Sequence, residues 1–366
     1  MIFNKYIKLY FLPCKKVCMK TKAAIFLLSI SFTLFSSIVK AQMDFSNIDQ
    51  LLEEKKEVLG KDFIVMVWKK DDTLVYKKQT NPQFKSVVQA PIASASKWLT
   101  AALVMMFVDE GKISLDDPVV NYIPEFGKYF KNYITIRNCL SQTTGIEAEP
   151  VKLMKLLERK KFESLEEEVN SFAAKKIVAN PGKEFFYGNI GLNIAGRVLE
   201  VVGKRRFDQL MVQRLFRKLS MRRSSFSNLM GGAINPSGGA KSSADDYMNF
   251  LVMMLNKGMF RGQQVLSEAA VNELIRVQTT PDMIKYAPEA AKGFNYASGA
   301  WVLEDDGKGN ATALACPGLF GTWPMIDYCH GYAYLFFVKD LLGEEKAAIH
   351  QQIIGMLNEK FSNTCQ

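Results

Sequence analysis

The chain has 366 residues, of which 48% are hydrophobic and 23% charged, an ordinary globular composition that excludes a disordered or fibrous protein. The formal net charge of +10 would suit a nucleic-acid or anionic-membrane partner. The two histidines, His330 and His350, are too few for a histidine-rich zinc site, and a Ser-His-Asp triad would have to use one of them. A hydrolase with this sequence is therefore expected to activate its nucleophile in another way.

Residues 1–41 have the layout of a secretory signal peptide. Two lysines precede an apolar run over residues 23–39, and Val39 and Ala41 place small residues at the −3 and −1 positions of a cleavage site. We therefore expect cleavage after Ala41, a periplasmic or secreted mature chain of residues 42–366, and no stable membrane span after cleavage. An uncleaved anchor is the alternative.

Removal of the signal changes the charge argument. Residues 1–41 hold seven lysines and no acidic residue, so the mature chain has 40 basic against 37 acidic residues and a net charge of +3. The remaining basic segments, residues 152–161 and 204–206, are interpreted as solvated helix surface. We therefore expect no nucleic-acid partner.

The mature chain is predicted to begin with strands, to continue as helices and to end with strands. Phe63–Trp68 and Thr73–Tyr76 form a predicted hairpin, a helix follows over Ala93–Glu110, and residues 112–225 are predicted to be mostly helical. The later predicted elements are helices over 164–176, 189–202 and 243–256, strands over 297–304, 321–328 and 332–338, and a closing helix over 344–361.

This order predicts an α+β protein in which both ends of the chain build one sheet and a helical lobe is inserted between them. The α/β lobe would comprise residues 45–112 and 291–366, and the helical lobe residues 113–290.

The cysteines add no further constraint on the fold. The mature chain keeps Cys139, Cys316, Cys329 and Cys365, which allow three pairings, and at this length buried free thiols are the expected state.

The first chemical motif is Ser94-Ala-Ser-Lys97, at the start of the predicted apolar helix. Residues three apart share a helix face, so the Lys97 amine can reach the Ser94 hydroxyl. A hydroxyl becomes a good nucleophile when a neighbouring base takes its proton, and a partly buried lysine can be neutral enough to do so. The alternative is that Ser94 caps the helix and Lys97 is a surface charge.

The second motif is Tyr187-Gly-Asn189, in a loop just before a predicted helix. A loop tyrosine beside a lysine can carry a proton, and an asparagine can hold a substrate amide or the lysine. Tyr247-Met-Asn249 has the same pattern, but it lies inside a predicted helix and is interpreted as packing.

With these motifs in this order, the chain resembles the serine hydrolases of the class C β-lactamase and D-alanyl-D-alanine carboxypeptidase superfamily, which includes β-lactamase-like esterases. The resemblance covers nearly the whole mature chain and is carried by PIASASKWLTAALVMMFVDEGKISLDDPVVNYIPEF, ITIRNCLSQTTGI, PGKEFFYGNIGLNIAGRVLEVVG, LFRKLSMRRSSF and NPSGGAKSSADDYMNFL. It implies a β-lactamase/transpeptidase-like fold with an antiparallel sheet flanked by helices.

The resemblance also implies the roles of the motif residues. Ser94 would be the acylated nucleophile, Lys97 and Tyr187 would share the proton transfers, and Asn189 would orient the substrate or Lys97. Which of Lys97 and Tyr187 is the general base stays open, because the pair would titrate together. Backbone N–H groups of Ser94 and Leu319 would form the oxyanion hole. This mechanism requires no metal or organic cofactor.

The third motif departs from the family. Relatives place Lys-Thr-Gly or His-x-Gly beside the nucleophile, whereas this chain has Cys316-Pro-Gly318-Leu319 there. The group that would hold a substrate carboxylate is lost, which favours ester or uncharged amide substrates over β-lactams and D-alanyl-D-alanine peptides. Gly318 suits a strand edge that a ligand backbone approaches closely. Cys316 is either a substrate-binding pocket thiol or a buried small filler.

An apolar wall for the acyl group is expected from some of Trp98, Tyr187, Phe320 and Trp323, and the others would be plain core. His330 and His350 are predicted to be surface residues. The sequence thus predicts an exported serine hydrolase for a small-molecule or peptide substrate. A β-lactamase or D-alanyl-D-alanine carboxypeptidase, and a catalytically silent binder of cell-wall peptides, are the alternatives. The sequence predicts no oligomeric state.

Overall fold

The computed structural model describes residues 43–71, 73–150, 162–227, 232–339 and 346–365. The predicted signal peptide and the basic segment 152–161 lie outside the described residues. Residues 44–366 cluster as one compact unit, which is the part considered below. No helix in the described ranges is long and apolar enough to cross a membrane.

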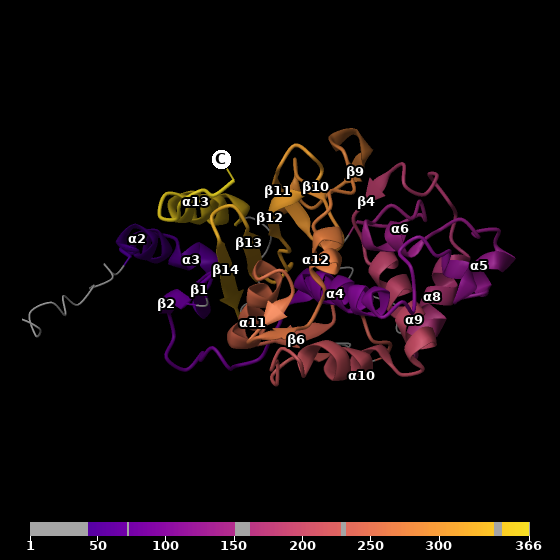
Figure 1. The fold of residues 1–366 in the computed structure, drawn as a ribbon, viewed down its shortest axis with the longest axis horizontal. Coiled ribbons are helices and arrows are strands. Elements are labelled where there is room, and N and C mark those ends of the chain that lie inside the picture. The colour runs from indigo at the N-terminus through magenta and orange to yellow at the C-terminus, as the bar shows by residue number, and fades with distance from the viewer. Residues whose placement is uncertain (1–42, 72, 151–161, 228–231, 340–345, 366) are drawn as a thin grey trace, which may run out of the picture. The chain divides into compact units, whose positions relative to one another are not determined.

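A seven-stranded antiparallel sheet is the largest element of the fold (Figure 1). Its strands, in spatial order, are β10 (Asn295–Tyr296), β11 (Trp301–Asp305), β12 (Ala311–Ala315), β13 (Trp323–Asp327), β14 (Tyr332–Val338), β1 (Phe63–Lys69) and β2 (Thr73–Gln79). Seven residues of β1 pair with seven of β14, from Phe63 opposite Val338 to Lys69 opposite Tyr332. The two ends of the chain therefore meet inside one sheet, which confirms the predicted α+β class and the antiparallel sheet.

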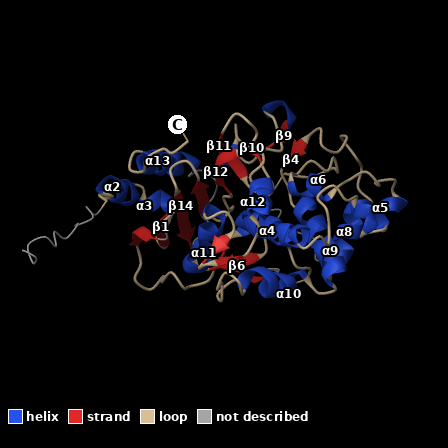
Figure 2. Ribbon diagram, viewed as in Figure 1, coloured by secondary structure: helices blue, strands red, loops and turns tan. Residues whose placement is uncertain are grey.

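The helices lie on both faces of this sheet and in a region beside it (Figures 1 and 2). They are α2 (Ser46–Glu54), α3 (Lys56–Leu59), α4 (Ser96–Asp109), α5 (Glu125–Lys128), α6 (Ile136–Leu140), α8 (Leu165–Ala173), α9 (Ile190–Gly203), α10 (Phe207–Met211), α11 (Ala244–Leu255), α12 (Glu268–Leu274) and α13 (Ala347–Asn358). Shorter helical turns are η1 (Ala93–Ala95), η2 (Val119–Asn121), η3 (Val212–Phe216), η4 (Pro281–Met283) and η5 (Glu289–Ala291). Small strands pair outside the main sheet: β3 (Ala90–Pro91) and β5 (Ser225–Phe226) with β6 (Ala240–Ser242), β4 (Phe185–Phe186) with β9 (Ile284–Tyr286), and β7 (Met259–Phe260) with β8 (Gln263–Gln264).

Strand β14 is buried on both faces, because successive side chains of a strand point to opposite sides. Tyr334 and Phe336 contact His350 of α13 on one side. Leu335 and Phe337 join the core cluster that contains α4 and α11 on the other. The sheet is thus the middle of three layers, and a strand buried on both faces reads as a continuous apolar run.

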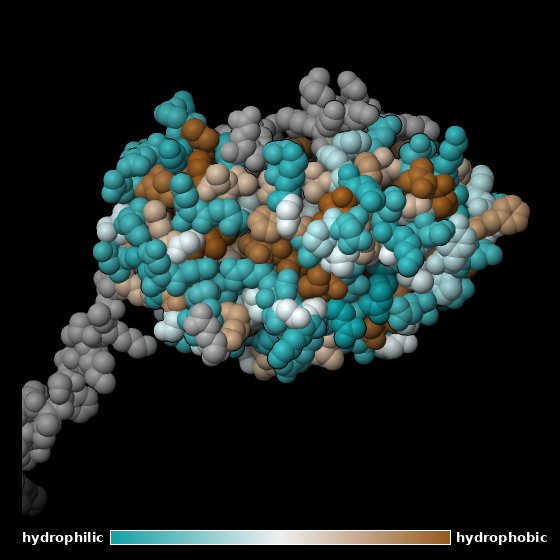
Figure 3. All heavy atoms as spheres, turned by 90° about the horizontal axis from the view of Figure 1, so that it is seen from above, coloured by the Kyte–Doolittle hydropathy of each residue, from teal (hydrophilic) through white to brown (hydrophobic). Residues whose placement is uncertain are grey.

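Helix α4 is buried on every side from Ser96 to Phe107. A helix that is apolar all round belongs in a protein core rather than at its surface. Its partners are α9 and α12, so it crosses the junction between the sheet and the helical region. Figure 3 shows hydrophilic side chains over most of one face of the molecule, with hydrophobic residues in separate patches.

Several predicted boundaries are wrong. Residues 112–164 contain only short helices and turns in their described part. The strand predicted from Ala297 begins at Trp301, because Gly299, at φ 82°, turns the chain close against α4. Strand β12 was not predicted, since its sequence ATALA carries little β-propensity. Helix α9 includes Gly203, whose absent Cβ leaves room for Leu210, and Lys204 takes the left-handed conformation instead.

The cysteine and histidine predictions are corrected in part. Cys329 and Cys365 form a disulfide, whereas Cys139 and Cys316 are free and buried as expected. Both histidines were predicted at the surface, which is wrong for His350, whereas His330 is only partly buried and lies in the predicted turn. His330 lies in the β13–β14 turn with Nδ1 2.8 Å from the buried Asp327 carboxylate, and His350 is 1% exposed.

The Cys329–Cys365 disulfide joins the β13–β14 turn to the last described residues across 36 positions. Replacing both cysteines by serine is expected to lower the free energy of unfolding by about 2–4 kcal/mol, because the crosslink restricts the unfolded chain. Denaturant unfolding of wild type and double variant measures this difference. Dithiothreitol should destabilise the wild type and leave the double variant unchanged; equal stability of the two proteins would contradict the prediction.

Candidate active site

Ser94 lies in the tight turn η1, immediately before α4. The turn is held from outside: Tyr247 Oη donates to the Ala95 carbonyl at 2.7 Å, and the Ile92 N–H donates to the Ala240 carbonyl at 3.1 Å. Ala93 has φ 45°, an uncommon conformation for a residue with a Cβ. The N-cap residue of α4 is Ala95, and it makes no side-chain cap, so Ser94 does not cap this helix. The turn is thus strained and is held by hydrogen bonds from neighbouring segments, and its residue Ser94 lines a cavity.

Lys97 is the second residue of α4 and is completely buried. Its Nζ lies 3.2 Å from Ser94 Oγ, 3.2 Å from Asn189 Oδ1 and 2.9 Å from the Ser237 carbonyl oxygen. All three partners are neutral, so desolvation dominates and lowers the pKa of Lys97 to about 7, although the nearby Cys316 acts to raise it. Near neutral pH a large fraction of this amine is therefore unprotonated and can accept a proton.

Tyr187 and Asn189 reach the same place from the loop between β4 and α9. The Tyr187 ring centroid is 4.9 Å from Lys97 Nζ, and its ring packs against Trp301 at 5.1 Å. The structure thus brings Ser94, Lys97, Tyr187 and Asn189 together, although Tyr187 lies 93 positions after Ser94 in the sequence.

Gln142 holds the Tyr187 loop from two sides. Its carbonyl accepts from the Phe186 N–H at 3.1 Å, and its side-chain amide donates to the Gly188 carbonyl at 3.2 Å. Gln142 is buried, and its φ of 59° is a left-handed backbone conformation that is uncommon for a residue with a Cβ. The sequence did not indicate this role.

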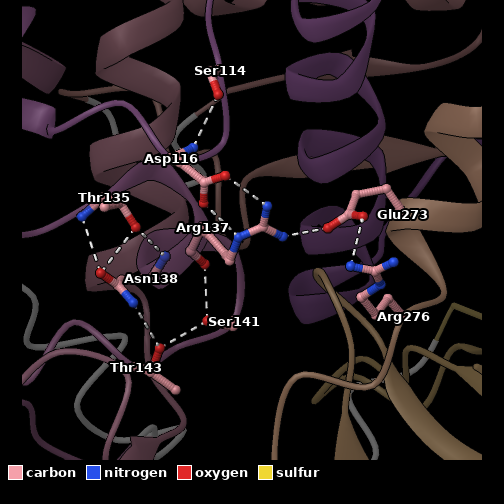
Figure 4. A network of polar contacts seen from close by, with 9 residues as sticks. All are labelled: Ser114, Asp116, Thr135, Arg137, Asn138, Ser141, Thr143, Glu273 and Arg276. Carbon is pink, nitrogen blue, oxygen red and sulfur yellow. Dashed lines mark hydrogen bonds and ion pairs between the residues drawn. The ribbon is translucent and has the colours of Figure 1, made fainter. Parts of the chain in front are cut away.

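The turn that contains Gln142 is itself anchored by polar contacts (Figure 4). Asn138 Oδ1 accepts from the Thr135 N–H at 3.0 Å and completes a capping box at the start of α6. Arg137 contacts Asp116 through Nε at 2.8 Å and also pairs with Glu273 of α12. These contacts tie α6, and hence the Gln142 turn, to two neighbouring parts of the fold.

A buried polar network that sequence reasoning missed supports the Lys97 site. Asn193 Oδ1 accepts from the Ser237 N–H at 3.0 Å, and its Nδ2 donates to Glu168 Oε2 at 3.1 Å. Ser237 Oγ donates to the Asn189 carbonyl at 2.7 Å. The network fixes the carbonyl that contacts Lys97. The sequence did contain one indication of this network, namely the polar residues Asn193 and Glu168 on otherwise apolar helix faces.

Cys316 lies beneath the nucleophile rather than in the cavity. Its Sγ is 3.3 Å from the carbonyl oxygens of both Ser94 and Gly299, and burial raises the pKa of its thiol to about 12. Cys316 is not among the residues that line the cavity. The geometry fits the buried small filler, and we assign no substrate contact to this thiol.

Gly318 permits a close approach, but the approaching backbone belongs to this chain. A Cβ at Gly318 would lie 2.2 Å from the Ile92 carbonyl oxygen, so no side chain fits there without movement of the backbone. The contact places Leu319 beside the Ser94 turn, and both residues line the cavity. Within the described ranges, neither the Ser94 nor the Leu319 N–H donates a backbone hydrogen bond, so both can serve an oxyanion.

Replacing Gly318 by alanine is expected to lower kcat by roughly 10²–10³-fold, the usual effect of losing an oxyanion donor. The new Cβ must displace the Ile92 carbonyl or the Leu319 segment. Steady-state kinetics with an aryl ester measures the change. Gly355→Ala in α13, where an added Cβ meets open space, is the matched control and should keep full activity. Wild-type kcat in Gly318→Ala would contradict the prediction.

The cavity that contains Ser94 is mainly apolar. It is lined by Ser94, Tyr187, Pro288, Ala290, Ala291, Trp301, Pro317, Gly318, Leu319, Gly321, Trp323, Lys346, Ala347 and His350. Of the four aromatic residues proposed for the acyl wall, Tyr187 and Trp323 line it, whereas Phe320 does not and Trp98 packs in the core against Phe250. Trp301, Lys346 and His350 were not predicted here.

The described residues contain no group of three or more His, Cys, Asp or Glu side chains that could hold a metal ion. The chemistry that this arrangement supports is acyl transfer. A hydroxyl lies beside an amine whose pKa is lowered to about 7, and a tyrosine ring lies next to that amine. Ser94 and Leu319, the two residues expected to supply the oxyanion donors, line the same cavity.

Comparisons with known proteins identify the family and the fold of the chain. The family model described as Beta-lactamase matches residues 48–354. A solved structure from Bacteroides dorei DSM 17855, provisionally assigned as a beta-lactamase, is similar with a TM-score of 0.76 and 25% identity, and it covers 86% of this chain and 99% of that one. EstCE1, a hydrolase with promiscuous acyltransferase activity, shares the fold with a TM-score of 0.68 and 17% identity, covering 85% of this chain and 97% of that one. Protein flp from Staphylococcus aureus (strain MW2) is 25% identical over 138 residues, which are 37% of this chain and span 27% of that relative's length.

Proposed function

The chain belongs to the beta-lactamase family, and we propose that it is an exported serine hydrolase that cleaves ester or amide bonds through an acyl-enzyme at Ser94. Members of this family are serine hydrolases. The observation that carries the proposal is the 3.2 Å contact between Ser94 Oγ and Nζ of a buried Lys97 whose hydrogen-bond partners are all neutral. Export is proposed on the signal-peptide layout of residues 1–41.

In the proposed mechanism, the Lys97–Tyr187 pair takes the Ser94 proton while Oγ attacks the substrate carbonyl carbon. The carbonyl oxygen becomes an oxyanion and accepts hydrogen bonds from the Ser94 and Leu319 N–H groups. The pair then returns the proton to the leaving alcohol or amine as the C–O or C–N bond breaks, and Ser94 is left acylated. Water attacks the acyl carbon, its proton passes to the pair and then to Ser94 Oγ, and the acid is released.

The reaction class is tested by comparing substrates on the mature protein. We expect turnover of p-nitrophenyl butyrate that is lost in Ser94→Ala, and slow turnover of nitrocefin. Rapid nitrocefin hydrolysis, or stoichiometric labelling by a fluorescent penicillin, would instead indicate a β-lactamase or D-alanyl-D-alanine carboxypeptidase. Binding of cell-wall peptides without turnover of any of these substrates would indicate the silent binding protein.

A further inference from the structure

The hydrogen-bond acceptors around the Lys97 amine match the donors of an ammonium group. Nζ lies 3.2 Å from Ser94 Oγ, 3.2 Å from Asn189 Oδ1 and 2.9 Å from the Ser237 carbonyl oxygen. An ammonium group carries three N–H donors, whereas a neutral amine carries two and one lone pair. In the neutral form, Asn189 and Ser237 can therefore take both N–H groups, which leaves the lone pair for Ser94 Oγ.

Ser237 acts on both of these acceptors. Its own carbonyl is one of them. Its hydroxyl donates to the Asn189 carbonyl at 2.7 Å and so fixes the residue that carries the other. Ser237 is completely buried, which shields this hydrogen bond from bulk water. The main chain and the side chain of a single residue thus hold two sides of the same amine.

Ser237 is itself held in place by two helices. Its N–H donates to Asn193 Oδ1 of α9 at 3.0 Å and to Asn235 Oδ1 at 3.2 Å. The Pro236 carbonyl, on the other side of that peptide bond, accepts from Thr100 Oγ1 of α4 at 2.7 Å. The peptide before Ser237 is therefore tied both to α9 and to the helix of the nucleophile motif.

We propose that Ser237 is a positioning residue, whose hydroxyl fixes Asn189 and thereby directs the lone pair of Lys97 at the nucleophile. The proposal rests on the proposed serine hydrolase function and adds to it a completely buried residue that is not among those lining the cavity. Proton transfer is efficient only when the donor and the lone pair are aligned. A small change in the direction of Nζ therefore lowers the rate without removing any reacting group.

The test is Ser237→Ala, which removes the hydroxyl and keeps the carbonyl that contacts Nζ. The Asn189 carbonyl still accepts from the Asn193 N–H at 3.2 Å, so this buried acceptor keeps a partner and the variant should stay folded. We expect kcat for p-nitrophenyl butyrate to fall by roughly 10- to 100-fold, the scale of a small misplacement of a reacting group.

Ser242→Ala is the matched control. Ser242 is also completely buried, but its hydroxyl lies 2.8 Å from the Ser224 hydroxyl and 3.3 Å from the Ser243 carbonyl oxygen, not beside a neighbour of Lys97. Its loss should lower the melting temperature at least as much as Ser237→Ala does. Because it leaves the Lys97 acceptors in place, kcat and the pH profile should stay those of the wild type.

The pH profile separates positioning from a general loss of structure. An acceptor stabilises an ammonium more than a neutral amine, so loosening Asn189 from Nζ lowers the pKa of Lys97 further. The acid limb of the activity, expected near pH 7 in the wild type, should move to lower pH by about half a pH unit or more in Ser237→Ala. Water entering a loosened core would move it to higher pH instead. The substitution leaves Tyr187 and Cys316, the titratable side chains that face Lys97, unchanged.

A titration that needs no catalysis separates this proposal from the proposed function. The 13Cε NMR signal of Lys97, identified by its absence from Lys97→Met, is followed against pH in the wild type and in Ser237→Ala. If its midpoint falls in the variant but the wild type hydrolyses no ester, the hydrolase function fails and the coupling of Ser237 to Lys97 stands. If the wild type hydrolyses esters and the variant keeps its kcat and its Lys97 midpoint, the hydrolase function stands and the positioning role fails. An acid limb that stays in place or moves to higher pH in Ser237→Ala also overturns the proposal.

Discussion

Replacing Lys97 by methionine is expected to lower kcat by roughly 10²–10⁴-fold, the range associated with loss of a general base. The two side chains are similar in length. Lys97 is completely buried, so replacing it by methionine removes the free-energy cost of burying an amine. That gain offsets the lost hydrogen bonds to Asn189 and the Ser237 carbonyl. The variant should therefore stay folded, and thermal unfolding together with ester kinetics separates lost chemistry from lost structure.

The pH dependence of the wild type provides the companion result. The pKa of Lys97 is lowered to about 7 because the amine is buried, so its neutral form dominates above that pH. Activity should rise as the pH increases through about 7 and level off above it. In Lys97→Met this ionisation should disappear from the residual activity. A flat wild-type profile between pH 6 and 9, measured at about constant ionic strength, would contradict the assignment.

Replacing Ser94 by alanine is expected to reduce ester hydrolysis by roughly 10⁴-fold or more, because no acyl-enzyme can then form. Lys97 would still contact Asn189 and the Ser237 carbonyl, so the buried amine keeps two of its three partners. The control is Ser96→Ala, two residues further along. Its hydroxyl contacts the Ala93 carbonyl and the Ala240 N–H, not Lys97, so its loss should reduce stability and retain acyl transfer.

Local sequence patterns predicted the first part of the site because its geometry is local. The i, i+3 spacing of Ser94 and Lys97 is enough to bring Oγ and Nζ within 3.2 Å once the segment is helical. The continuous apolar runs of β1 and β14 likewise predicted these two strands. Tyr187 and Asn189 required the family resemblance as well, since no spacing rule places a distant loop over Lys97.

Other features of the site could not be predicted from the sequence, because they depend on contacts between segments that are far apart in the chain. The Ser237 group that contacts Lys97 is a backbone carbonyl, which leaves no side-chain pattern to recognise. Gly318 was predicted to meet a ligand backbone, but it meets the Ile92 carbonyl because that segment packs on the nucleophile turn. His350 was predicted at the surface, yet Trp323 and Tyr334 of two sheet strands bury it. Lys346 reaches the cavity only because α13 packs across the sheet.

The most direct test of the central claim is covalent labelling of the nucleophile. The mature protein is treated with a fluorophosphonate probe, and the intact mass and the modified peptide are determined for wild type, Ser94→Ala and Ser96→Ala. We expect one adduct per chain, located on Ser94, in the wild type and in Ser96→Ala, and none in Ser94→Ala. An unlabelled wild type, or equal labelling of Ser94→Ala, would contradict the assignment of Ser94 as the nucleophile.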